Sequence, residues 1–208
     1  DFQGLGEAEA VIQPGDRFND TINGNTAYPI IADPDGLELN RLQIEYSGLP
    51  QTVVTLGRQR INLDNQRFVG AVGWRQNEQT FDALRVVNTS VDGLALTYVF
   101  VNQVNRIFGD ESPQGAFEEP SHFFNAAYDL PPIGKIVGYA YLVDIDVASM
   151  RNQASASFGL RVTGKKDVGG GYALGYEAEY AHQNDYGNNP NDVSLGYWHG
   201  DLSVARSG

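Results

Sequence analysis

Several arginines lie in segments where polar and apolar residues alternate, which could place their side chains together on one face of a sheet. Arg58 and Arg60 are two residues apart in the run TVVTLGRQR. A guanidinium stays charged at any working pH, and its planar fork can bind a carboxylate through two parallel hydrogen bonds. A set of such groups along a water-filled passage would select anions. The arginines that we single out on this basis are Arg41, Arg58, Arg60, Arg85 and Arg161.

Carboxylates occupy similar alternating positions. Glu45, Glu177 and Glu179 are expected on the same interior surface as the arginines, with Glu7, Glu9 and Asp144 as further candidates. Two interpretations follow. The arginines form part of a path for a solute, or they pair with the carboxylates across neighbouring strands and only fill the interior with satisfied charges. A glutamate pair at i and i+2 could also resemble a glycosidase site, although a structural role beside arginine is the simpler interpretation.

Other site chemistries find little support. The chain has no cysteine, which excludes cysteine nucleophiles and cysteine-bound metals. His122, His182 and His199 are far apart and lack metal-ligand spacing. Ser121 and His122 are adjacent, so on a strand they would point to opposite faces and could not form a hydrolase pair. The glycines at 169–171 join two expected strands and predict a turn. We therefore expect no enzyme activity, no metal and no cofactor.

The segments that carry these residues have a period of two, which is typical of strands. Each runs for about ten residues, longer than the ~5–6 usual in soluble sheets and close to the ~9–11 that a tilted strand needs to cross a bilayer. No apolar run is long enough for a transmembrane helix. The predicted strands are 3–13, 37–48, 52–61, 79–89, 94–104, 121–130, 135–146, 153–163, 171–182 and 193–205.

Short and long connections alternate along the chain. Gly48–Gln51, Ser90–Gly93, Pro131–Gly134 and Gly164–Gly170 are rich in turn-forming residues. The remaining connections are mostly longer: 14–36, 62–78, 105–120, 147–152 and 183–192. Outer-membrane barrels have short periplasmic turns and long external loops. The loop 62–78 either folds inward and narrows a pore or orders itself at the surface.

Because successive side chains of a strand point to opposite faces, odd and even positions can be assigned to the lipid-facing or the interior side. Leu42, Ile44, Leu84 and Val86 would meet lipid, and an arginine there costs ~2–4 kcal/mol near the midplane, so we expect the arginines to point inward. Aromatic residues near strand ends fit the girdles of a barrel or a sandwich core. They are Tyr46, Tyr98, Tyr128, Tyr139, Tyr141, Tyr172, Tyr180, Tyr197 and Trp198.

The run VTLGRQRINLDNQRFVGAVGWRQNEQTFDALRVVNTS, residues 54–90, resembles the alginate export family of outer-membrane channels. Further similar pieces are 26–41, 105–115 and 138–146. The resemblance implies an up-and-down transmembrane β-barrel of about eighteen strands, of which about ten are present here. It also implies an arginine-lined pore for an anionic polymer or solute and a monomeric channel. We expect residues 1–208 to form a single β-barrel domain, an incomplete N-terminal portion.

The leading hypothesis is therefore a channel of the bacterial outer membrane for passive diffusion or export of anionic solutes, including alginate-like oligosaccharide or polysaccharide. Its expected partners are membrane lipid and lipopolysaccharide. The acids on the long-loop side either bind divalent cations between lipid head groups or simply keep the loops soluble. The net charge of −12 argues against nucleic acid. The alternatives are an unselective porin, a soluble β-sandwich that binds or processes carbohydrate, an outer-membrane hydrolase and a surface adhesin.

Overall fold

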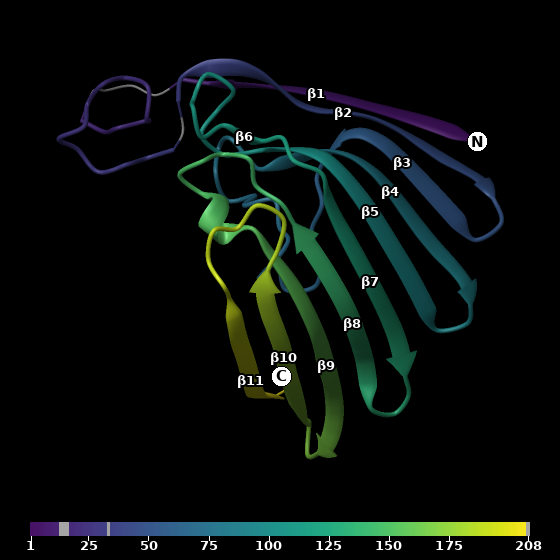
Figure 1. Cartoon of the computed structure of the whole chain (residues 1–208). Helices are drawn as coiled ribbons and strands as arrows, with labels where there is room; N and C mark the ends of the chain where they lie inside the picture. Colours follow the sequence, from purple (N-terminus) through teal and green to yellow (C-terminus); the bar gives the residue numbers. More distant parts are fainter. Residues whose placement is uncertain (13–16, 33, 207–208) are drawn as a thin grey trace.

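A single antiparallel sheet carries the chain (Figure 1). The structure is a computed structural model, and it describes residues 1–12, 17–32 and 34–206. A 3-10 turn, η1, covers Arg151–Gln153. The strands are β1 (Phe2–Val11), β2 (Gly36–Leu49), β3 (Thr52–Gln59), β4 (Thr80–Val91), β5 (Leu94–Asn105), β6 (Ala116–Phe117), β7 (Ser121–Leu130), β8 (Gly134–Val143), β9 (Ser155–Gly169), β10 (Tyr172–Asp185) and β11 (Ser194–Arg206).

Each long strand pairs with the strand that follows it, in the order β1-β2-β3-β4-β5-β7-β8-β9-β10-β11. The short β6 pairs with β5 outside this path. Figure 1 shows that the sheet is curved, with β1 and β11 at its two edges. This antiparallel meander is the wall of an up-and-down barrel, as the alternating sequence predicts.

The predicted long strands are confirmed, and their ends differ from the predictions by a few residues. Position 13, predicted as the end of the first strand, and residues 14–16 and 33 of the first long loop lie outside the described residues. The connection predicted at Gly164–Gly170 is wrong for most of its length, because β9 remains paired with β10 as far as Gly169. The two-residue β6 lies inside the predicted loop 105–120.

One face of the sheet is apolar and open. Directly opposite residues in the register share a face, so Ile44, Leu56 and Leu84 form a row across β2, β3 and β4. Leu56 is 56% exposed, Leu160 on β9 is 55% exposed and Leu202 on β11 is 78% exposed. A soluble sandwich would bury such a face against a second sheet. The described residues contain only this one sheet, so the soluble β-sandwich alternative is wrong, and this face is the lipid-facing wall.

Aromatic residues lie toward both ends of this lipid-facing wall. Tyr180 and Trp198, near the long loops, have ring centroids 4.2 Å apart, and Phe2 and Tyr46, near the short turns, are 4.6 Å apart. Amphipathic rings at these levels match the girdles of membrane barrels.

Three tyrosines assigned by sequence to the girdles lie elsewhere. Tyr139, Tyr141 and Tyr197 are on the concave face, where they belong to a cluster covered by the connection between β3 and β4. The interface interpretation is wrong for them because their parity is opposite to that of the lipid-facing residues.

The concave face carries the only extensive core among the described residues. The connection 60–79 folds onto it, and Ile61 and Val69 are 1% and 3% exposed. The cluster beneath this loop consists of Phe81, Ala83, Val99, Val101, Val104, Phe123, Val137, Tyr139, Tyr141 and Ala181. Of the two predictions for this loop, the structure shows the inward fold. We call residues 60–79 the inner loop.

Candidate functional site on the concave face

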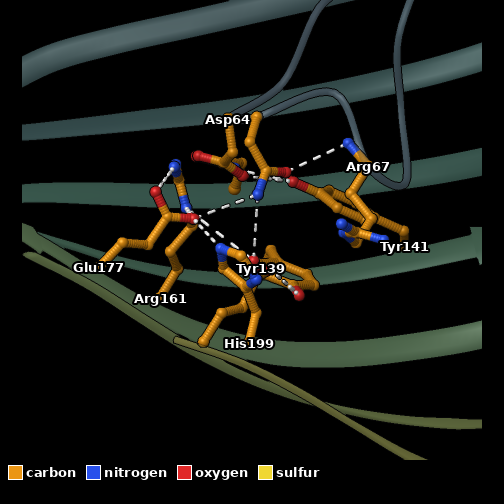
Figure 2. Close-up of polar contacts among 10 residues, drawn as sticks. Asp64, Arg67, Tyr139, Tyr141, Arg161, Glu177 and His199 are labelled. Atoms are coloured by element: carbon orange, nitrogen blue, oxygen red, sulfur yellow. Dashed lines mark hydrogen bonds and ion pairs between the residues drawn. The ribbon is translucent and has the colours of Figure 1, made fainter. Parts of the chain in front are cut away.

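Arg161 lies at the centre of a polar network on β9 and β10 (Figure 2). Its Nε and Nη2 donate to the two carboxylate oxygens of Glu177 over 2.9 and 2.7 Å, the bidentate geometry of a strong pair. Glu179 lies 3.9 Å away. The His199 Nε2 of β11 lies 3.5 Å from the Glu177 Oε1 that accepts from Arg161 Nε. Sequence parity therefore placed Arg161, Glu177 and Glu179 on the same interior face, and the structure pairs them with one another.

The inner loop is attached to this network. The Asn65 amide donates to Glu177 and Glu179, each over 3.3 Å, and the Tyr139 hydroxyl donates to Glu179 over 2.6 Å. Asp64 accepts from the Tyr141 hydroxyl over 3.0 Å. Figure 2 shows these groups converging from the loop and from strands β8 to β10. Glu179 of β10 accepts hydrogen bonds from Asn65 of the inner loop and from Tyr139 of β8, and these bonds hold the inner loop against the barrel wall.

Aromatic packing adds an apolar attachment. Phe68 at the loop tip lies 5.6 Å from the Tyr139 ring, 6.3 Å from Tyr141 and 5.8 Å from Tyr197. The Arg67 guanidinium lies 4.9 Å from the Tyr197 ring centroid, within cation–π range. The inner loop is thus held by both polar and apolar contacts, and it occupies space inside the curve of the sheet.

A second network connects the base of the inner loop to β1 and β2. Arg41 pairs with Glu7, and the Asn40 amide donates to Glu7 over 2.6 Å and to Glu78 over 3.1 Å. Arg60, just beyond β3, donates to Glu78 over 2.5 Å. This hydrogen bond raises the pKa of Arg60 above that of a free guanidinium. Arg41 and Arg60 are therefore both in ion pairs.

Arg85 differs from these arginines. It lies on the concave face of β4 opposite Thr55 and Val99, and its closest polar contact is a 3.5 Å hydrogen bond to the Thr55 hydroxyl. Glu45, another residue predicted for this face, accepts from the same hydroxyl over 3.5 Å. Among the described residues Arg85 forms no ion pair, and its Nε has no hydrogen-bond partner.

The predicted orientation of Arg58 is wrong. Its register partners are Leu42 and Asp82, which places it on the face of Leu56. Arg58 does not place an unpaired charge in lipid, because it lies near the long-loop end of β3 and forms an ion pair. Its Nε and Nη2 donate to the two carboxylate oxygens of Asp82 over 2.8 and 3.0 Å. Its third contact is a 3.1 Å hydrogen bond to the Leu39 carbonyl.

Two further candidates have different surroundings. Glu9 lies opposite Glu38 on the face of Glu7. Asp144 follows β8, where its backbone N–H donates to the Ser121 hydroxyl over 3.1 Å, so it belongs to the long-loop end rather than to the middle of the wall. Sequence reasoning did not single out the anchoring roles of Asp64, Asn65 and Glu78. The only signal for them was the polar run between two strands.

Across residues 1–12, 17–32 and 34–206, no group of histidine and acidic side chains has the geometry to hold a metal ion. Within the same ranges, no helix has the length and apolarity for crossing a membrane.

The sequence profile of the alginate export family matches residues 7–194, which include the inner loop and the ion pairs of Arg41, Arg60 and Arg161. The chain belongs to the alginate export family. No curated protein sequence matches it significantly. Together with the fold, this membership makes the chain part of a transmembrane β-barrel of the bacterial outer membrane.

Solved structures show the same fold. OccAB2 from Acinetobacter baumannii has a TM-score of 0.67 and 13% identity, over 82% of this chain and 43% of that one. OccK2 (OpdF) from Pseudomonas aeruginosa, solved with glucuronate, has a TM-score of 0.64 and 13% identity, over 83% and 46%. A BenF-like porin from Pseudomonas fluorescens Pf-5 has a TM-score of 0.63 and 15% identity, over 83% and 43%. The alginate export chain therefore spans less than half the length of these proteins.

Breaking the Arg161 network should loosen the inner loop of this alginate export chain. In Arg161→Leu, Glu177 and Glu179 lose their cation, and we expect a loss of about 1–3 kcal/mol in the free energy of unfolding. Denaturant unfolding of the protein in lipid vesicles measures this. The double variant Arg161→Leu with Glu177→Leu should lose less, because it removes one of the two uncompensated carboxylates. If the loss in the double variant equalled the sum of the losses in Arg161→Leu and Glu177→Leu alone, the pair would not couple.

Proposed function

We propose that this chain forms part of the wall of a passive outer-membrane channel for anionic solutes, with sugar acids and alginate-like oligomers as the substrate class. The observation that carries the proposal is the pair Arg85 and Arg67 on the concave side. Neither forms an ion pair among the described residues, whereas Arg41, Arg60 and Arg161 all do. Guanidinium groups without a carboxylate partner inside a water-filled passage attract anions.

The comparisons support the choice of solute. The family to which the chain belongs is described as alginate export. One similar porin was solved with glucuronate, and another was solved with vanillate. Each of these molecules carries a carboxylate, which suits guanidinium recognition. The transport is passive diffusion, and the proposal includes no enzymatic step.

A second candidate is a porin with little charge selectivity. It is favoured by the ion pairs of Arg41, Arg60 and Arg161, which leave these cations largely neutralised by Glu7, Glu78 and Glu177. In that case the lumen charges fix the inner loop and do not sort solutes. Arg85 decides between the two candidates because it is the one predicted pore arginine that the described residues leave without an ion pair.

The assembly also belongs to the proposal. The chain covers only 41–46% of the porin chains it resembles, and both edges of the described sheet, β1 and β11, have one neighbour each. We expect further strands to close one barrel around the concave face, with residues 1–208 as one incomplete N-terminal domain of a monomer. Membrane lipid and lipopolysaccharide would surround its outer face.

Replacing Arg85 should reduce anion selectivity. In planar bilayers the complete channel should favour chloride over potassium, and Arg85→Gln should lower this permeability ratio. The reduction should be largest at low salt, because 1 M salt shortens the screening length to about 3 Å. The reversal potential under a salt gradient measures the ratio.

Arg58→Gln is the matched control, since Arg58 lies on the outer face and pairs with Asp82. It should leave the reversal potential unchanged. An equal permeability ratio in the native channel and in Arg85→Gln would favour the unselective porin. A complete protein that carries no current would contradict both candidates.

A further inference from the structure

Trp74 is an exposed tryptophan at a turn of the inner loop. It is 77% exposed, and the turn is closed by a hydrogen bond from the Arg75 backbone N–H to the Val72 carbonyl over 3.0 Å. The Arg75 guanidinium lies 4.4 Å from the indole centroid. With most of the side chain open, this cation covers only one face of the indole, and the other face is available for contact.

The turn lies on the inner side of the wall. Gly73, Arg75 and Gln76, the neighbours of Trp74, line a cavity of about 260 Å³. The same cavity is lined by Glu7, Glu9 and Asn40 from the concave face of β1 and β2, and by Arg60 and Glu78. Arg75 lines this cavity and its guanidinium stacks on the Trp74 ring, so the indole lies next to a set of hydrogen-bonding groups.

The chain offers an internal comparison. Trp198 is also 77% exposed, but it lies on the outer wall, 4.2 Å from the Tyr180 ring in a girdle that faces lipid. Contact with the membrane therefore explains why the Trp198 side chain is exposed at the surface of the protein. It does not account for the exposure of Trp74, whose neighbours are charged and amide side chains.

The charges around Trp74 are balanced. Three carboxylates, Glu7, Glu9 and Glu78, match three guanidinium groups, those of Arg41, Arg60 and Arg75. A ligand here would be recognised through its shape and its hydrogen-bonding groups more than through its net charge. A pyranose ring has the required form, with an apolar C–H face that stacks on an aromatic ring and hydroxyl groups around its edge.

We infer that Trp74 is a stacking platform for a sugar ring on its way through the channel, with Gln76 and the cavity beside it binding the hydroxyls. The site rests on the proposed channel function but is independent of the anion selectivity assigned to Arg85. It accepts neutral sugars and uronates alike, and it slows their passage without trapping them.

Current blockade by sugars tests this site in the complete channel. The probes are a neutral gluco-oligosaccharide and an oligomer of a uronic acid. Both should block the native channel transiently, and Trp74→Ala should shorten the residence time of each about two- to tenfold, the range that one aromatic stack supports. Trp74→Phe should retain part of the effect. Trp198→Ala, the matched outer-wall control, should retain all of it.

The outcomes separate the site from the channel. Equal residence times in the native channel and Trp74→Ala, with current intact, would overturn the sugar site and leave the channel standing. Arg85→Gln should change ion selectivity without changing the residence time of the neutral sugar. In a complete channel in which Trp198 and every tryptophan outside residues 1–208 are replaced by phenylalanine, acrylamide should quench Trp74 fluorescence, and added sugar should protect it. A Trp74 that acrylamide never reaches would be covered by protein, which would also overturn the inference.

Discussion

Replacing Ile44 by arginine should destabilise the barrel in a bilayer by about 2–4 kcal/mol, the cost of this charge near the midplane of the lipid face. Ile44 is 48% exposed on the outer side of β2, opposite Gly4 and Leu56. The arginine would have to replace contacts with lipid chains, and the outer face offers no carboxylate at this register position. Denaturant unfolding in lipid vesicles gives the free energy.

Gln43→Arg is the matched control for this substitution. Gln43 is the preceding residue of the same strand, so its depth is nearly the same, but its register partners Leu5 and Gly57 place it on the concave face. The new arginine would lie beside Glu45 in a wet interior, and we expect a change near zero. Equal costs at the two positions would mean that β2 has no lipid-facing side.

Truncating Phe68 should release the inner loop. Its ring contacts three tyrosines of the concave face, and removal of a buried phenylalanine costs about 3–5 kcal/mol. Because Phe68 is half-buried, Phe68→Ala should lie at the lower end of this range. The loop would then move away from the wall more often, so single-channel recordings should show a changed unitary conductance and increased open-channel current noise.

The control for Phe68→Ala is Phe124→Ala. Phe124 is 46% exposed on the outer face, where lipid can fill the space that its ring leaves. Conductance and current noise should match those of the native channel. If Phe68→Ala also gave native recordings, the inner loop would not be part of the conducting path.

The fold was predictable because lipid imposes a strict pattern. Every second residue of each long strand must be apolar, and this alternation gave the strands to within a few residues. The alternating pattern failed to predict strand residues where the strand does not have to present apolar side chains to lipid. The stretch Gly164–Gly169 has polar residues on both faces, yet it continues the hydrogen-bonded ladder of β9 because it lies beyond the hydrocarbon. The short β6 has too few residues to show any alternation.

The site was predictable only in part, and Arg58 shows why. Sequence reasoning assumed that no arginine points outward, but Asp82 on the neighbouring strand supplies a partner for Arg58. Such a pairing depends on the register between strands, which a single sequence does not give. The assumption held for Arg85 and Arg161, whose neighbours Leu84 and Leu160 face lipid. Whether these residues line the pore remains a prediction.

The fold of the inner loop could not be predicted from the sequence, for another reason. Alternation identifies which residues point inward but not what they meet there. The parity of Tyr139 and Tyr141 puts them on the inner face of β8, but only their contacts with Phe68 show that they belong to an interior cluster. The polar residues Asp64 and Asn65 look like those of any surface loop until their partners on β8 and β10 are known.

The central claim is that the concave face meets water and the opposite face meets lipid. The 208 residues contain no cysteine, so single cysteines at positions 41–46 can be spin-labelled one at a time in lipid vesicles, in a complete protein whose cysteines outside these residues are replaced by serine. Accessibility to a water-soluble paramagnetic reagent should be high at Arg41, Gln43 and Glu45, and accessibility to oxygen should be high at Leu42, Ile44 and Tyr46. Equal accessibility along the strand, or the opposite alternation, would contradict the claim.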